Sequence, residues 1–128
     1  MATDQMRSKV AAAYAAWDAA FGTGDARKVA ACYTDDAVLL PPSHEVLDGP
    51  AGVEKFFGGL FANGVTGHKL ELVRVIGEDS AAMIVAAAKW SAQGKDASGA
   101  PATFGGIGTH VFEKQADGSL KLKLHTFN

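Results

Sequence analysis

Hydrophobic positions in the first half of the chain recur at the spacing of helices. Apolar side chains return every three or four residues over 4–22, which builds one apolar stripe and predicts a helix that ends at a glycine-rich segment. A short second helix is predicted over 25–32, behind an aspartate that can cap it. A third helix is predicted over 50–62, where a proline suits the first turn. Between them, 37–40 is an apolar run that predicts a short strand stopped by two prolines.

In the second half the apolar positions alternate with polar ones, as in strands with one buried face. Strands are predicted over 69–76, 81–91, 103–113 and 120–127. The last two are separated by Asp117-Gly118, a strong signal for a two-residue hairpin turn. Helices followed by strands that run back and forth are typical of the α+β class. We therefore expect one α+β domain over residues 1–128, with an antiparallel sheet.

Two histidines face each other if that turn has two residues. Counting back from the turn pairs His110 with His125, and directly opposed residues have Cβ atoms about 4.5–5.5 Å apart. The two imidazoles would be placed to share a proton, bind a metal or hold an anion, or to form a structural hydrogen-bonded pair. Histidine titrates near neutrality, which makes both residues candidate catalytic groups for acid–base chemistry. Two ligands on adjacent strands are too few for a metal site, so no metal is expected.

The same count pairs Phe112 with Lys123 and sorts the last two strands into two faces. The histidines share one face, whereas Val111, Leu122 and Leu124 lie on the other, more apolar face. A bulge would swap the faces midway along a strand. The apolar row is too hydrophobic to face water on a monomer, so we predict a homodimer through the sheet face that carries it.

Composition narrows the class of protein. The 128 residues carry 12 basic and 14 acidic side chains, a formal net charge of −2, which argues against a nucleic-acid binder and against a polybasic membrane anchor. Met1–Arg7 shows no basic segment followed by an apolar run, and no apolar stretch approaches the ~18 residues of a membrane span. The single cysteine, Cys32, excludes an intramolecular disulfide. We therefore expect a cytoplasmic protein that binds no nucleic acid and no membrane.

Several short motifs occur in an order that resembles a known family. They are Trp17, Gly24-Asp25-Ala26, Tyr33-Thr34-Asp35-Asp36-Ala37-Val38, Asp48-Gly49, Asp117-Gly118 and the ending His125-Thr126-Phe127-Asn128. Together they make almost the whole chain similar to the SnoaL-like, ketosteroid-isomerase-like proteins of the nuclear transport factor 2-like superfamily. The resemblance implies a cone-shaped, curved antiparallel sheet packed on three helices of the N-terminal half. It also implies an apolar pocket in the cone and homodimers that pack through their sheets.

The resemblance points to three positions for the catalytic groups of ketosteroid isomerase. The catalytic base falls on Pro41, the hydrogen-bonding tyrosine on Trp17, and the strand-borne acid on Gly108. Proline accepts no proton, indole only donates a hydrogen bond, and glycine has no side chain. We therefore expect that the protein is not a true steroid Δ-isomerase and that the likeness concerns the fold.

Two classes of function remain open for this chain. The first is a small-molecule-pocket protein that works as a cofactor-independent acid–base enzyme of the isomerase, cyclase or dehydratase kind. It would act on a hydrophobic small molecule, with His110 and His125 as its titrating groups. The alternative is a non-catalytic binding or dimerisation domain, and no cofactor is expected in either case. We expect the following residues to line the pocket: Trp17, Leu40, Phe57, Phe61, Met83, Phe112 and Phe127.

Overall fold

The computed structural model describes residues 3–128. Met1 and Ala2 lie outside the described residues, and with them the start of the Met1–Arg7 segment in which no signal peptide is expected. In chain order the elements are α1 (Asp4–Gly22), α2 (Ala26–Ala30), β1 (Tyr33–Leu40), β2 (Leu47–Asp48), α3 (Gly49–Ala62), β3 (Thr66–Ile76), β4 (Met83–Lys95), β5 (Pro101–Lys114) and β6 (Leu120–Phe127). Every helix and strand predicted from the hydrophobic pattern is present, and β2 is an additional short strand. No helix within residues 3–128 is long and apolar enough to cross a lipid bilayer.

Helix α1 forms as its apolar stripe predicts. The hydroxyl of Thr3 accepts a hydrogen bond from the backbone N–H of Met6 at 3.2 Å and caps the first turn. The stripe packs mainly against β3 and forms a large part of the core. Its buried residues are Met6, Val10, Tyr14, Trp17 and Phe21.

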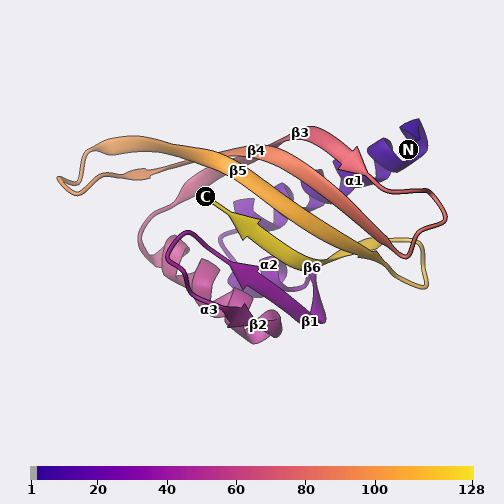
Figure 1. Cartoon of the computed structure of the whole chain (residues 1–128). Helices are drawn as coiled ribbons and strands as arrows, with labels where there is room; N and C mark the ends of the chain where they lie inside the picture. The colour runs from indigo at the N-terminus through magenta and orange to yellow at the C-terminus, as the bar shows by residue number, and fades with distance from the viewer. Residues whose placement is uncertain (1–2) are drawn as a thin grey trace.

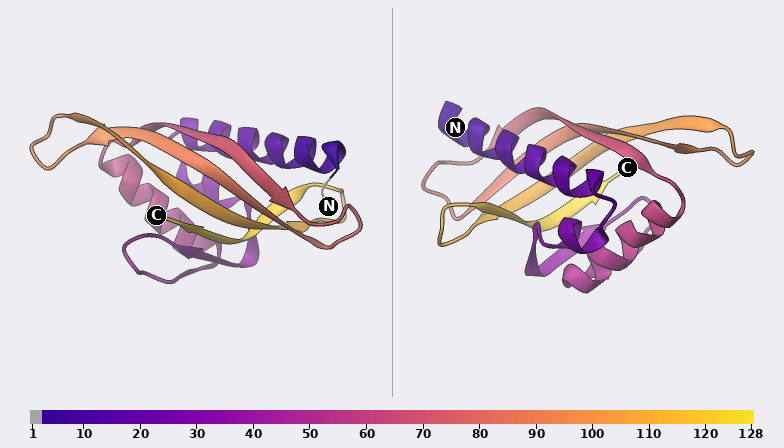
Figure 2. Two further views of the ribbon diagram at one scale, coloured as in Figure 1. Left: turned by 45° about the horizontal axis from the view of Figure 1, so that its top comes forward. Right: turned by 180° about the vertical axis from the view of Figure 1, so that it is seen from behind.

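The six strands of the described chain form one sheet in the order β2-β1-β6-β5-β4-β3. Neighbouring strands are antiparallel except β1 and β6, which run parallel. The expectation of a wholly antiparallel sheet is therefore wrong at this pair, because β1 and β6 are far apart in the chain and no hairpin connects them to impose an antiparallel direction. The sheet is curved, and α1, α2 and α3 lie on one of its faces (Figures 1 and 2).

The hairpin between β5 and β6 has a longer turn than predicted. The N–H of Gln115 donates to the carbonyl of Ser119 at 2.8 Å, and Gly118 has a φ of 85°, in the left-handed region that glycine favours. Lys114 then pairs with Leu120. The loop is thus one residue longer than a two-residue turn, as in three-residue hairpins with glycine at the left-handed position.

A β-bulge in β6 follows this turn. Phe112 pairs with Leu122, whereas the neighbouring Val111 pairs with Leu124, so Lys123 is the extra residue on β6. Because side chains alternate between the two faces of a strand, the extra residue reverses which face the later residues of β6 occupy.

The longer turn and the bulge cancel at the histidines. Each shifts the pairing by one residue, in opposite directions, so that His110 lies opposite His125 as predicted. The predicted pair of Phe112 with Lys123 lies on the turn side of the bulge and is wrong. Lys123 instead reaches Asp36 on β1, with its Nζ 2.7 Å from the carboxylate Oδ2.

The bulge also moves Leu122 into the core. Leu122 is 3% exposed and belongs to the buried cluster, like its partner Phe112. Leu124 is only partly buried and lies outside that cluster. The prediction that Leu122 shares an outer face with Val111 and Leu124 is therefore wrong for Leu122.

The face of the sheet opposite the helices is left open by residues 3–128 (Figure 2). A row of apolar residues crosses it from β3 to β6, through the paired positions Ile76, Val85, Val111 and Leu124. Ile76 at the end of this row is 60% exposed. The corrected apolar row thus contains Leu124 and not Leu122.

Candidate functional site

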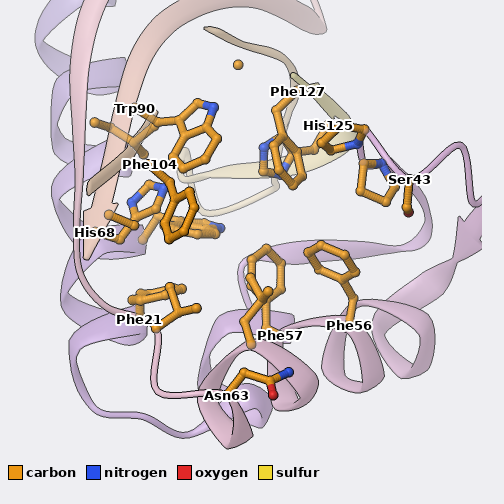
Figure 3. A pocket seen from close by; sticks show the side chains of 18 of the residues that line it. Phe21, Ser43, Phe56, Phe57, Asn63, His68, Trp90, Phe104, His125 and Phe127 are labelled. Carbon is orange, nitrogen blue, oxygen red and sulfur yellow. The ribbon is translucent and has the colours of Figure 1, made fainter. Parts of the chain in front are cut away.

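A cavity of about 350 Å³ lies between the helices and the inner face of the sheet. Figure 3 shows Phe56 and Phe57 on α3 facing Trp90 on β4 and Phe127 on β6 across this space. Its polar lining residues are Ser43, Asn63, His68, Lys95, His110 and His125. Its aromatic lining residues are Trp17, Phe21, Phe56, Phe57, Trp90, Phe104 and Phe127. The wall is therefore mainly apolar, with aromatic rings as its largest side chains and three imidazoles among its polar groups.

The structure brings five of the predicted site residues together on this wall. They come from α1, α3, β5 and β6, so residues far apart in the sequence converge only in the fold. They are Trp17, Phe57, His110, His125 and Phe127.

The other four predicted pocket residues lie elsewhere. Leu40 ends β1 outside the cavity lining. Phe61 packs behind the wall, with its ring centroid 4.7 Å from that of Phe21. Phe112 is buried in the core, and Met83 begins β4 with 46% of its surface exposed. The prediction considered hydrophobic character, whereas position along each strand and helix decides which residues reach the cavity.

His125 is held by a buried chain of hydrogen bonds. The indole N–H of Trp17 donates to the hydroxyl of Tyr33 at 3.2 Å, and that hydroxyl lies 2.7 Å from Nδ1 of His125. Because indole can only donate, the hydroxyl proton of Tyr33 is directed at Nδ1, and the neutral imidazole carries its own proton on Nε2. No buried side-chain nitrogen or oxygen of residues 3–128 lacks a partner, so Nε2 of His125, which makes no hydrogen bond, is reached from the cavity.

His110 is anchored in a parallel way. Its Nδ1 lies 2.8 Å from the hydroxyl of Tyr14 on α1. The rings of His110 and His125 are 4.5 Å apart between centroids at an interplanar angle of 40°. Within the described chain the two imidazoles make no hydrogen bond to each other, so the proton shared directly between them, one of the options from sequence, is absent. Each histidine bonds a tyrosine instead.

Both imidazoles are uncharged at neutral pH. Burial, aided by charge on His68 and opposed by the Ala86 backbone, lowers the pKa of His110 to about 4. Burial, followed by charge on His110 and His68, holds the pKa of His125 well below its usual value. Burial likewise raises the pKa of Tyr14 and Tyr33, which keeps both hydroxyls protonated.

The three positions that the resemblance matched to ketosteroid isomerase all line this cavity. They are Trp17, Pro41 and Gly108. A Cβ placed on Gly108 would lie 2.9 Å from Cε1 of His110, so this glycine makes room for the imidazole ring. The imidazole of His110 can therefore take this position only because residue 108 has no side chain.

A third imidazole of the wall, His68, was not assigned a role from sequence. His68 on β3 lines the cavity, and its Nδ1 lies 2.8 Å from Oδ1 of Asp18 on α1. The other carboxylate oxygen, Oδ2, accepts the backbone N–H of Leu70 at 2.9 Å. The sequence feature that could have indicated this pair is Asp18, an acidic residue directly after the buried Trp17 on α1.

Comparison with known proteins identifies the family. A family model described as the SnoaL-like domain matches residues 11–122. This chain belongs to the SnoaL-like family. The family predicted from the motifs is thus confirmed, and a search of curated proteins finds no match.

Solved structures share the SnoaL-like fold. A candidate calcium/calmodulin-dependent protein kinase II association domain from Xanthomonas campestris has 28% identity and a TM-score of 0.80, covering 98% of this chain and 87% of that one. A ketosteroid isomerase-like protein from Erwinia carotovora atroseptica has 22% identity and a TM-score of 0.82, covering 98% and 96%. An NTF2-like protein with a cystatin-like fold from Novosphingobium aromaticivorans has 15% identity and a TM-score of 0.76, covering 94% and 79%. The predicted fold class is confirmed.

In this SnoaL-like protein, Tyr33→Phe is expected to cost about 3 kcal/mol of unfolding free energy. The change leaves two buried groups without a partner, the indole N–H of Trp17 and Nδ1 of His125. Tyr14→Phe is the matched control, because it leaves only Nδ1 of His110 unpartnered and should cost about half as much. Urea unfolding followed by circular dichroism measures both; equal losses would contradict the proposed hydrogen-bond chain.

Proposed function

We propose that this SnoaL-like protein binds a small hydrophobic molecule in the aromatic cavity and catalyses cofactor-independent proton transfer on it. The ligand carries a ring system and one carbonyl or hydroxyl oxygen. The observation that carries the proposal is a neutral imidazole, His125, whose Nε2–H opens into an apolar cavity lined by aromatic and aliphatic side chains.

The shape and chemistry of the cavity support this ligand class. Its volume of about 350 Å³ lies at the lower end of the ~300–1,000 Å³ that small-molecule sites occupy. Aromatic walls favour flat rings, which stack or meet them edge to face. A neutral imidazole that donates from a fixed position can polarise a carbonyl without carrying charge itself.

Family membership supports the reaction class in general terms. One solved structure of this fold is named a ketosteroid isomerase-like protein, which is consistent with an isomerase-type reaction for this cavity. In this chain the cavity positions Trp17, Pro41 and Gly108 offer no carboxylate, so proton transfer must use other residues of the wall.

Binding is tested with 2-tetralone, a hydrophobic ketone of two fused rings. Both tryptophans of the chain, Trp17 and Trp90, line the cavity, so quenching of intrinsic fluorescence reports occupancy directly. We expect saturable quenching that Phe56→Ala weakens about tenfold through loss of one ring contact. Phe61→Ala is the control, since Phe61 lies on the same helix outside the cavity lining. Absence of saturable binding, or equal effects of the two variants, would overturn the proposed ligand site.

We propose in addition that two copies of the chain pair through the open sheet face. The apolar row of Ile76, Val85, Val111 and Leu124 lies on that face, across the sheet from the helices. A continuous exposed apolar patch on a monomer is unfavourable in water, and a symmetric partner would cover it. Pairing on this face keeps the cavity on the other side of the sheet available to ligand.

A further inference from the structure

The carboxylate of Asp18 determines the tautomer of His68. Oδ2 accepts the backbone N–H of Leu70, and Oδ1 lies 2.8 Å from Nδ1 of His68. A carboxylate only accepts hydrogen bonds, so Nδ1 of His68 carries a proton, and in the neutral imidazole the lone pair is on Nε2. Nε2 makes no hydrogen bond within residues 3–128, and no buried side-chain nitrogen there lacks a partner, so Nε2 is open to the cavity that His68 lines.

The ring of His68 is held rigidly between two indoles. It is stacked on Trp90 at an interplanar angle of 4° with 5.9 Å between centroids, and it lies 4.6 Å from the ring of Trp17. The same Trp17 ring contacts His125 edge-on at 6.2 Å. The indole thus separates the two imidazoles, which lie on opposite sides of the cavity (Figure 3).

The histidines of the cavity therefore differ in what they offer a ligand. His125 uses Nδ1 to accept the hydroxyl of Tyr33 and keeps its proton on Nε2, whereas Nδ1 of His110 is engaged by the hydroxyl of Tyr14. His68 differs from both, because its Nδ1 faces a carboxylate and so the neutral ring presents its Nε2 lone pair to the cavity. The remaining polar residues of the wall, Ser43, Asn63 and Lys95, carry neither imidazole nor carboxylate.

We propose that His68, positioned by Asp18, is the general base of this cavity, and that the Nε2–H of His125 holds the ligand's carbonyl oxygen. The inference rests on the proposed function and names the residues that perform its chemistry. The substrate class is a hydrophobic ring ketone with an acidic hydrogen on the carbon beside the carbonyl. His68 and His125 are the catalytic residues, and Asp18 is a positioning residue.

The step conserves atoms and electrons. The C–H bond beside the carbonyl breaks, and its proton passes to Nε2 of His68. The electron pair of that bond forms a carbon–carbon double bond, while the carbonyl π pair moves to the oxygen, which accepts the hydrogen bond from Nε2 of His125. Return of a proton from His68 to the same carbon or to a conjugated one completes exchange or isomerisation.

Proton transfer is tested by hydrogen–deuterium exchange of 2-tetralone in D₂O. NMR follows the hydrogens on the carbon between the aromatic ring and the carbonyl, and fluorescence quenching gives the binding constant in parallel. We expect wild-type protein to accelerate exchange over buffer and His68→Gln to slow the bound-state rate at least a hundredfold, with binding within about threefold. His44→Gln is the control, because His44 is exposed and lies outside the cavity lining.

Asp18→Asn separates positioning from structure. An amide has one acceptor oxygen, so if that oxygen keeps the N–H of Leu70, the amide NH₂ donates to Nδ1 of His68 and moves the imidazole proton to Nε2. We expect ¹⁵N chemical shifts of His68 to change from the Nδ1–H to the Nε2–H tautomer. Exchange should fall as in His68→Gln while 2-tetralone still binds.

The outcomes separate this inference from the proposed function. Failure of 2-tetralone to bind would overturn the proposed ligand site. Binding without accelerated exchange would overturn the assignment of His68 as base and leave a non-catalytic binding domain. Retained exchange in His68→Gln would do the same. Retained exchange in Asp18→Asn, despite a changed tautomer, would remove the positioning role of Asp18.

Discussion

Acidification from pH 7 to pH 4 is expected to lower the free energy of unfolding by about 3 kcal/mol through His110 alone. Burial lowers the pKa of His110 from 6.5 to about 4 in the folded protein, and a tenfold change in a protonation equilibrium corresponds to ~1.4 kcal/mol. Because the folded pKa is depressed, the stabilisation is fully present above the unfolded value of 6.5 and is lost as the pH falls towards 4. His125 adds a loss of the same sign, since its pKa is also lowered by burial.

Urea unfolding at a series of pH values from 7 to 4.5 measures this effect. The slope should be about 1.4 kcal/mol per pH unit for each buried histidine. His110→Gln should flatten the curve, whereas His44→Gln, at an exposed position, should leave its slope unchanged. The pKa values of Asp36, Asp96 and Asp117 are lowered from 3.8, so these carboxylates affect the free energy of unfolding mainly below pH 4. That is outside the measured range of pH 7 to 4.5. Parallel curves for wild type and His110→Gln would contradict a neutral buried imidazole.

Leu122→Glu is expected to unfold the domain, whereas Leu124→Glu should leave it folded. Leu122 is 3% exposed in the core, and a carboxylate there has no partner for its charge, which costs ~4 kcal/mol or more. Leu124, two positions along, lies on the open face beside Val111. Circular dichroism and thermal unfolding distinguish the two variants.

Light scattering extends the same comparison to the proposed dimer. Wild-type protein should have the mass of two chains, and Leu124→Glu should have the mass of one, because it places charge in the apolar row of the open face. Leu124→Ala is a milder control that should keep the dimer with weaker affinity. A folded Leu122→Glu variant would contradict the bulge at Lys123, and a dimeric Leu124→Glu variant would place the interface elsewhere.

Local patterns in the sequence were sufficient for the elements and for the family. The helical stripe from Met6 to Phe21 is buried as its spacing predicted, since α1 needs only one apolar face directed at the sheet. The motif order around Trp17 and Tyr33 correctly indicated a SnoaL-like fold. These inferences depend on residues close in sequence or on an ordered set of motifs, and neither requires knowledge of how distant segments pack.

The opposition of His110 and His125 was predicted correctly, although two features of the hairpin differed from the expectation. Gly118 belongs to a turn one residue longer than assumed, and Lys123 is bulged. Turn length is decided by backbone geometry that Asp117-Gly118 alone does not specify. At the bulge, Lys123 forms an ion pair with Asp36 on β1, a contact with a distant segment that the hairpin sequence alone does not specify.

By itself the sequence determined the helices and strands, the family and the two histidines that face each other, because these follow from local periodicity, turn signals and motif order. Only the tertiary structure decided which residues form the cavity wall, which side of the sheet Leu122 occupies, and that Asp18 meets His68. Asp18 and His68 lie 50 residues apart in the chain, on α1 and β3. Such a contact is determined by how a helix packs on a curved sheet, and the spacing of residues along the chain does not predict it.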